Sequence, residues 1–168
     1  MTVTETIRKR RSIRKYIHGA DIPPDDLNII LEAAMTAPSA CNSRPWEFII
    51  IKSEEIKKEI INIHPFAKHL KDAATGIVIC GRPDLQHGVS DGFWPQDCAA
   101  AAENILLQAS GLGYGSCWCG IYPKKPLVEK FTNLLNITSI PFALITIGTP
   151  SEIPPAKGFY DETRISFR

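Results

Sequence analysis

Apolar side chains follow two different spacings along this chain. In "DDLNIILEAAMTA", Leu27, Ile30 and Ala34 stand three or four residues apart, which places them on one face of a helix. The stretches "WEFIIIK" (46–52) and "TGIVICG" (75–81) are short, continuous and rich in β-branched residues, as buried strands are. The pattern therefore predicts a chain that contains both helices and strands.

Capping and turn residues set the limits of the other elements. Thr2 and Glu5 fit a capping box, so we expect a helix over about 3–11. Pro24 is well placed at the start of the helix described above, and Pro38 ends it. Further helices are expected at 53–63, 95–111 and 126–135, and further strands at 115–122 and 141–150.

Helices and strands alternate along residues 1–168 without an internal repeat or an interdomain linker. This interleaving favours a single domain of the α+β class, with a central mixed β-sheet flanked by helices. A length of 168 residues with 44% apolar and 22% charged side chains is typical of a globular protein with one core. The longest apolar runs, "FIII" and "GIVIC", are far short of the roughly 20 residues that span a bilayer, and the N-terminus lacks an apolar signal core. We interpret the protein as cytoplasmic, without a membrane partner.

The tail from Ser151 is rich in proline and has no core pattern of its own. It carries the apolar residues Phe159, Tyr160, Ile165 and Phe167. Because these side chains have no partners within their own segment, we expect an extended C-terminal arm that packs on another part of the fold or on another subunit. A homodimer is a reasonable expectation on this ground alone.

One short segment concentrates the positive charge. "RKRRSIRK" (8–15) has six basic residues and no acid, and the rest of the chain has 13 basic and 18 acidic residues, a net charge of −5. Nucleic-acid binding requires a broad surface that neutralises phosphates, which this negative remainder disfavours. The segment is then either a solvated helix face or a compact phosphate pocket, where a few bases converge with a hydroxyl. The embedded Ser12 favours the pocket.

Five cysteines stand at positions 41, 80, 98, 117 and 119, an odd number without the spacing of a disulfide framework. Cys117 and Cys119 form a C-x-C pair, but no second pair supplies further zinc ligands and the four histidines are scattered. We interpret the cysteines as small core-filling thiols in a reducing compartment, and we expect no metal site.

Three segments together carry a resemblance to a known family. They are "RKRRSIRKY" at the N-terminus, "APSACNSRPWEF" at 37–48 and "DGFWPQDCAAAAENILLQASGLGYGSCWCGIYP" at 91–123. In order and spacing they are similar to the motifs R-R-S-x-R-x-[FY], A-P-S-x-x-N-x-Q-P-W and N-x-x-L-x-A-x-x-x-G-L-G-x-x-W-x-G. The chain thus resembles the nitroreductase family of FMN-dependent oxidoreductases over nearly all of its length.

The resemblance implies that the first motif holds the FMN phosphate, the ribityl chain and the pyrimidine edge of the ring. Arginine suits a phosphate because its planar fork donates two parallel hydrogen bonds. The matching residues here are Arg10, Arg11, Ser12 and Arg14. Arg8 and Lys9 match nothing in the motif, and we expect them to be solvated.

The second motif, in the resembling enzymes, comes from the partner subunit and lines the isoalloxazine ring. The matching residues are Pro38, Ser39, Ala40 and Asn42, and the alternative is a plain turn that ends a helix. Arg44 departs from the usual glutamine. It is expected either near the flavin, where its charge would stabilise the reduced ring, or in solvent or paired with an acid at the dimer interface.

The third motif places Cys119 and Gly120 against the reactive face of the flavin by resemblance. No base or resolving partner stands at a readable spacing from Cys119, so a structural thiol is favoured over thiol chemistry. In the tail, Arg164 matches the last arginine of R-[FY]-D-x-x-R-[IV]-H, and Lys157 is a weaker candidate for the phosphate. Phe159 stands where that ending has its first arginine, so one phosphate contact of the family is missing here. Arg44 is a candidate to supply that contact.

The resemblance therefore implies a homodimeric FMN enzyme with flavin sites shared between subunits. It would transfer hydride from NADH or NADPH through FMN to a small acceptor such as a nitroaromatic compound or a quinone. The chemistry is the cofactor's, so no side chain is assigned as a catalytic acid or base. The alternatives are a specialised reaction such as reductive dehalogenation or flavin fragmentation, for which 81–94 is short as a lid, and a non-catalytic or redox-sensing flavin-binding protein.

Overall fold

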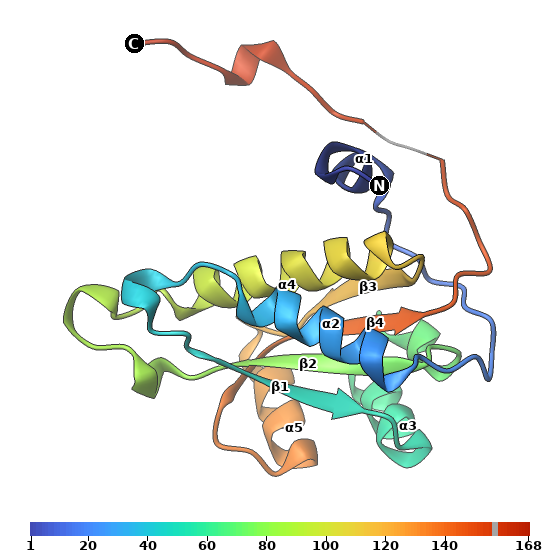
Figure 1. The fold of residues 1–168 in the computed structure, drawn as a ribbon. Coiled ribbons are helices and arrows are strands. Elements are labelled where there is room, and N and C mark those ends of the chain that lie inside the picture. The colour runs from blue at the N-terminus through green and yellow to red at the C-terminus, as the bar shows by residue number, and fades with distance from the viewer. Residues whose placement is uncertain (156–157) are drawn as a thin grey trace.

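A four-stranded sheet forms the centre of the protein (Figure 1), in a computed structural model that describes residues 1–155 and 158–168. The strands lie in the order β1-β2-β4-β3. Their bounds are β1 Trp46–Ile51, β2 Thr75–Gly81, β3 Gly115–Gly120 and β4 Ile140–Gly148. The expected α+β class is confirmed, and the expected strands lie where the sequence placed them to within two residues.

The pairing of the sheet differs from the mixed sheet that we expected. All three strand pairs are antiparallel, and the parallel contact is an isolated bridge between Ser12 and Ser116. The physical reason is the path of the connections. The helix after β1 returns the chain to the end of the sheet where β1 stopped, so that Gly76, the second residue of β2, pairs with Ile51. An antiparallel pair results.

Helices cover both faces of the sheet (Figure 1). Their bounds are α1 Val3–Lys9, α2 Pro24–Met35, α3 Glu54–Ile63, α4 Trp94–Gly111 and α5 Lys125–Leu135. Helices α2 and α4 pack on one face against Ile77 and Ile79, whereas α3 and α5 pack on the other face against Val78 and Cys80. Strand β2 is therefore buried on both sides, as its continuous apolar run predicts.

Short 3-10 turns complete the structure, at η1 Ala40–Asn42, η2 Lys68–Lys71, η3 Pro83–Leu85, η4 Gly88–Ser90 and η5 Glu162–Arg164. Helix α1 has the predicted capping box, in which the Thr2 hydroxyl accepts from Glu5 N at 3.2 Å. The helix ends two residues earlier than expected, because Arg10 turns into the extended segment that bridges to β3. Among the described residues, no helix has both the length and the apolar character needed to cross a bilayer.

The C-terminal tail runs outward beyond α1 and away from the sheet (Figure 1). Phe159 and Tyr160 are each 75% exposed and Phe167 is 94% exposed. Helix α1 likewise buries none of its residues and exposes Val3 and Ile7. Both ends of the chain thus present apolar side chains to solvent, as the expected arm would, and the packing of that arm on a second subunit stays a prediction.

Candidate functional site

The basic segment (residues 10–14) lies between α1 and the edge strand β3. Ile13 N donates to the carbonyl of Ser116 at 2.9 Å, and the Arg10 guanidinium lies 3.8 Å from the Glu103 carboxylate on α4. These contacts fix both ends of the segment. The first cavity, of about 340 Å³, is lined by Arg10, Arg11, Ser12, Arg14, Pro154 and Pro155. The structure therefore brings together all four residues that the first motif predicted.

The start of the tail closes over this segment. Arg14 N donates to a Glu152 carboxylate oxygen at 2.8 Å, and Arg11 Nε donates to the Pro155 carbonyl at 3.3 Å. One carboxylate thus lies beside the bases. The guanidinium group of Arg14 is exposed, and it is not held by that contact because the backbone amide is the donor.

The second cavity, of about 480 Å³, opens beside the first and shares Arg14 with it. Its other lining residues are His64, Pro65, Phe66, Lys68, His69, Cys117, Trp118, Cys119 and Gly120. A Cβ atom built on Gly120 would meet no atom within 4 Å, so the backbone of β3 faces open space there. This volume is within the usual range for pockets that hold small molecules and cofactors, about 300–1,000 Å³. Cys119 and Gly120 therefore line a cofactor-sized cavity next to the basic segment.

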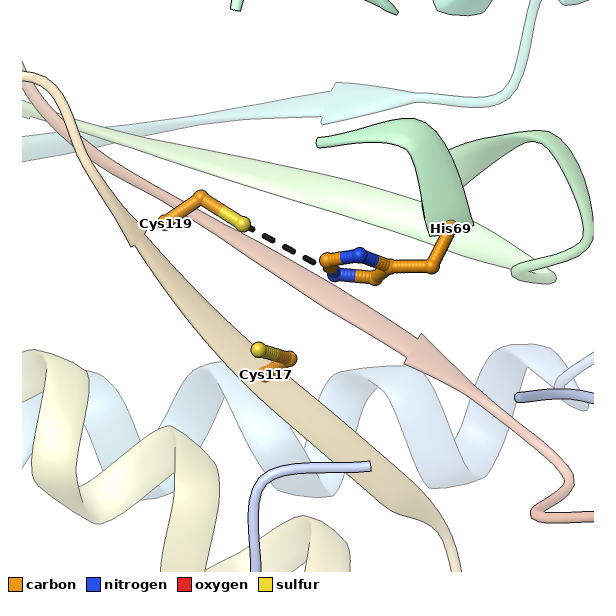
Figure 2. A group of neighbouring side chains, drawn as sticks. All are labelled: His69, Cys117 and Cys119. Carbon is orange, nitrogen blue, oxygen red and sulfur yellow. Dashed lines mark hydrogen bonds between the residues drawn. The ribbon is translucent and has the colours of Figure 1, made fainter. Parts of the chain in front are cut away.

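Three side chains with nucleophilic or metal-binding atoms meet at the wall of this cavity (Figure 2). Cys117 and Cys119 point to the same face because they are two apart on β3. His69 on η2 faces them, with its Nε2 3.7 Å from the Cys119 Sγ. The hydrogen bond between the two thiols lowers the pKa of Cys117, and the same interaction together with burial raises the pKa of Cys119. We name these residues the thiol–imidazole cluster.

Sequence reasoning missed His69. It found no base near Cys119, because the two residues are 50 positions apart and join only when η2 packs against β3. No spacing rule connects them. Trp118, between the two cysteines, points to the opposite face and packs against the core of α2 and α4.

The 38–44 loop has an unusual backbone. Cys41, Asn42 and Arg44 have φ angles of 50°, 54° and 48°, in the left-handed region that non-glycine residues rarely adopt. Each such residue costs on the order of 1–3 kcal/mol and persists only where the surroundings impose it. The loop is therefore more than a turn that ends α2.

A buried carboxylate anchors the start of this loop. Asp97 on α4 accepts from Ala40 N at 3.1 Å and from Gln86 Nε2 at 3.0 Å. The side-chain oxygen Oε1 of Gln86 in turn accepts from Trp94 N at 2.9 Å. Burial raises the pKa of Asp97. These three residues (Asp97, Gln86 and Trp94) form an anchor network that no motif in the sequence indicated.

Arg44 and Asn42 face a different part of the surface. Arg44 Nε donates to Asn42 Oδ1 at 3.0 Å, and Arg44 N donates to the Ser39 hydroxyl at 2.9 Å. The third cavity, of about 510 Å³, is lined by Glu32, Met35, Thr36, Ala37, Asn42 and Arg44. None of these residues lines the first or the second cavity. Within one chain, Asn42 and Arg44 of the second motif therefore lie outside the two cavities that the first and third motifs line.

Arg164, one of the two tail residues predicted for the phosphate, does not line the first cavity. Arg164 Nε lies 3.1 Å from Asp161 Oδ2, and its guanidinium carbon lies 4.9 Å from the centre of the Phe159 ring. Lys157 lies outside the described residues. A contact between Arg164 and a phosphate stays a prediction, and it would require another position of the tail or a second subunit.

The family model described as "Nitroreductase family" matches residues 7–74 and 64–149. This chain belongs to the nitroreductase family. The match spans the basic segment, the 38–44 loop and β3, which are the three regions that carried the resemblance in the sequence. Family membership and the α+β fold are thereby confirmed.

Relatives cover almost the whole chain. A Methanothermobacter thermautotrophicus protein named as a candidate NADH dehydrogenase/NAD(P)H nitroreductase is 41% identical over 98% of this chain and 86% of its own length. A crystal structure of a similarly named Parabacteroides distasonis protein has a TM-score of 0.92 and 32% identity, over 98% of this chain and 96% of the other. An FMN-dependent nitroreductase from Clostridium difficile R20291 has a TM-score of 0.86 and 29% identity, over 96% of each chain.

Proposed function

We propose that the protein is an FMN-dependent oxidoreductase of the nitroreductase type. The observation that carries the proposal is the convergence of Arg10, Arg11, Ser12 and Arg14 on one cavity that shares Arg14 with a second, cofactor-sized cavity. Such an arrangement suits a ligand with a phosphate at one end and a flat ring at the other. FMN has this shape, and the Clostridium difficile relative is named as FMN-dependent.

The residues present fit FMN at both ends. Arginine side chains and the Ser12 hydroxyl supply donors for a phosphate in the first cavity. The open space before Gly120 leaves room for a ring to approach the backbone of β3. Arg14, which lines both cavities, would hold the ribityl chain or the pyrimidine edge. Lys68 adds a second positive charge to the lining of the ring cavity.

Bound FMN would accept hydride from NADH or NADPH and pass reducing equivalents to a small acceptor, such as a nitroaromatic compound or a quinone. The chain itself would bind the phosphate, orient the ring and stabilise the negative charge of its reduced form through Arg14 and Lys68. No side chain is required as a general acid or base. The wall of the second cavity would limit which acceptors reach the ring.

We infer that each flavin site is shared between two subunits of a homodimer. The separation of the 38–44 loop from the first two cavities supports this inference, because Ser39, Ala40 and Asn42 cannot complete a site that they do not line. The anchor network presents the loop outward in a strained conformation. The exposed apolar residues of α1 and of the tail offer further surface for the contact.

The purified protein provides the test. We expect a flavin absorbance spectrum, one FMN per chain and bleaching of that spectrum by NADH or NADPH without oxygen, followed by reoxidation on adding a nitroaromatic compound or a quinone. Tight FMN without bleaching would instead identify a non-catalytic flavin-binding protein. Failure to bind added FMN would overturn the proposal, and halogenated phenols in the acceptor screen would detect reductive dehalogenation.

A further inference from the structure

The thiol–imidazole cluster places three metal-ligating atoms close together. His69, Cys117 and Cys119 each offer one such atom, and these atoms all lie within 4.8 Å of one another. All three side chains are buried, with exposed fractions of 9%, 2% and 4%. We propose that this cluster binds a thiophilic metal cation of the zinc class, and that the metal and the flavin exclude each other.

The spacing of the ligand atoms fits tetrahedral coordination. Zinc binds sulfur at about 2.3 Å and imidazole nitrogen at about 2.0–2.1 Å, so the S···N edge of a tetrahedron is about 3.6 Å. The Cys119 Sγ and His69 Nε2 are already 3.7 Å apart. The Cys117 Sγ lies on the same face of β3, beside the other two atoms (Figure 2). Binding would therefore require only small changes of side-chain torsion.

The surroundings select the class of cation. The residues that line the second cavity include no carboxylate, so hard cations such as Mg²⁺ and Ca²⁺ lack the oxygen ligands that they prefer. Two thiols release their protons on binding and neutralise the two charges of Zn²⁺. The cavity leaves the fourth coordination position open to water, as in sites with three protein ligands.

The other cysteines do not form such a group within the described residues. Cys80 and Cys98 are buried, and burial raises the pKa of each to about 12. Cys41 is exposed on the 38–44 loop. The Cys41 thiol therefore provides a matched control, since it is more accessible than the cluster but lacks a histidine and a second thiol beside it.

The exclusion of flavin by metal rests on the proposed function. Cys119 and His69 line the cavity that would hold the isoalloxazine ring. A metal with a bound water would occupy part of the cavity that Cys119 and His69 line, and a bound ring would cover the open coordination position. Zinc would thus inhibit flavin loading without contacting the phosphate cavity.

Cobalt titration of the reduced, full-length, flavin-free protein tests the metal site directly. We expect a thiolate-to-Co²⁺ charge-transfer band that saturates at one equivalent per chain and is abolished by adding Zn²⁺, which binds such ligands more tightly. The band should persist in Cys41→Ser and disappear in Cys117→Ser/Cys119→Ser. His69→Gln keeps both thiols and should weaken Co²⁺ binding at least 10-fold. If the double variant does not fold, the Co²⁺ affinity of His69→Gln tests whether the thiol–imidazole cluster is the metal site.

The results that overturn the proposal are equally distinct. A wild-type protein without the band, an unchanged band in the double variant, or unchanged affinity in His69→Gln would each reject the site. Adding FMN to the Co²⁺ complex should bleach the band, and FMN binding beside a persistent band would reject the exclusion. If metal-free protein fails to bind FMN while the band forms, the proposed function fails and the metal site stands.

Discussion

The basic segment and the 38–44 loop differ in how completely one chain forms a cavity around their polar side chains. The basic segment meets β3 and the start of the tail, and its four predicted residues line one cavity. The loop has equally firm support, from Asp97 and Gln86, but its polar side chains lie on a separate surface. One region forms a pocket within the chain, and the other presents its polar side chains outside that pocket.

The difference indicates what stabilises each region. The basic segment is held by a backbone contact to β3 and by the side-chain contacts of Arg10 and Arg11, whereas Arg14 is exposed. The loop holds three left-handed residues, a conformation that persists only where the surroundings stabilise it, and Asp97 anchors the loop at Ala40. A strained loop with a buried anchor and an outward face is typical of a functional surface rather than of a connection.

Complementation between two damaged chains gives the largest effect expected from this contrast. Arg10→Ala/Arg14→Ala removes the phosphate ligands, and Ser39→Trp/Asn42→Ala blocks the loop, so neither homodimer should bind FMN. Mixed heterodimers should regain one intact site, measured as FMN absorbance after chain exchange. If exchange is proven by mass spectrometry and no FMN binding returns, the two regions do not share a site.

Single substitution of Arg14 should produce the next largest effect. Arg14 lines both cavities, and a hydrogen bond to a charged group contributes about 1.5–3 kcal/mol, so Arg14→Ala should weaken FMN binding by about 10- to 150-fold. Equilibrium dialysis with FMN measures this loss. Arg8→Ala, on the exposed face of α1, is the matched control and should bind FMN normally. Equal affinity in both variants would contradict a role for Arg14.

The sequence predicted local features of the fold well. The capping box of α1 joins two residues that are three positions apart, so a short stretch of sequence is enough to predict it. The burial of β2 on both faces requires a continuous apolar run, which is also visible within one short stretch. The antiparallel pairing was missed, because apolar patterns do not specify whether a connecting helix crosses the sheet or returns at the same end.

The candidate site was predictable only where it is continuous in the sequence. Four residues that line the first cavity lie within five positions of the sequence, and a run of positive charge around one hydroxyl indicated them. His69 and Asp97 were missed, since each acts on a residue about 50 positions away and only packing creates the contact. Long-range polar contacts between single residues leave no periodic signal.

Asp97 offers a stability test of the loop anchor. Asp97→Ala leaves the Ala40 amide and the Gln86 side chain without their acceptor, which should lower the free energy of unfolding by about 1–3 kcal/mol in urea titrations. The exposed Asp91 is the control, and its replacement by alanine should have little effect. A normal stability for Asp97→Ala would show that the loop does not depend on this anchor.

The same residue should also give a pH dependence. Burial raises the pKa of Asp97, so the folded state holds the proton more tightly than the unfolded state does. The stability that arises from this pKa difference is therefore present below the unfolded pKa of about 3.9. It is lost as the pH rises through the pKa of the folded state. Asp97→Asn cannot titrate, and the stability of the wild-type protein relative to this variant should fall with rising pH across that interval. A constant difference would contradict the raised pKa.

Arg44 should give the smallest effect, and it tests what the outward face of the loop does. No carboxylate lies within 4.0 Å of its guanidinium among residues 1–155 and 158–168, so its charge is not neutralised there. If the loop of one subunit lies near the flavin of the other, Arg44 favours the negatively charged reduced ring, and Arg44→Gln should lower the two-electron potential. A shift of about 30 mV corresponds to roughly 1.4 kcal/mol, a plausible size for one screened charge.

The control is Arg8→Gln, which removes a charge from α1 and should leave the potential unchanged. An unchanged potential with weaker FMN binding would instead place Arg44 at the phosphate, and no change in either quantity would make it a surface or interface residue.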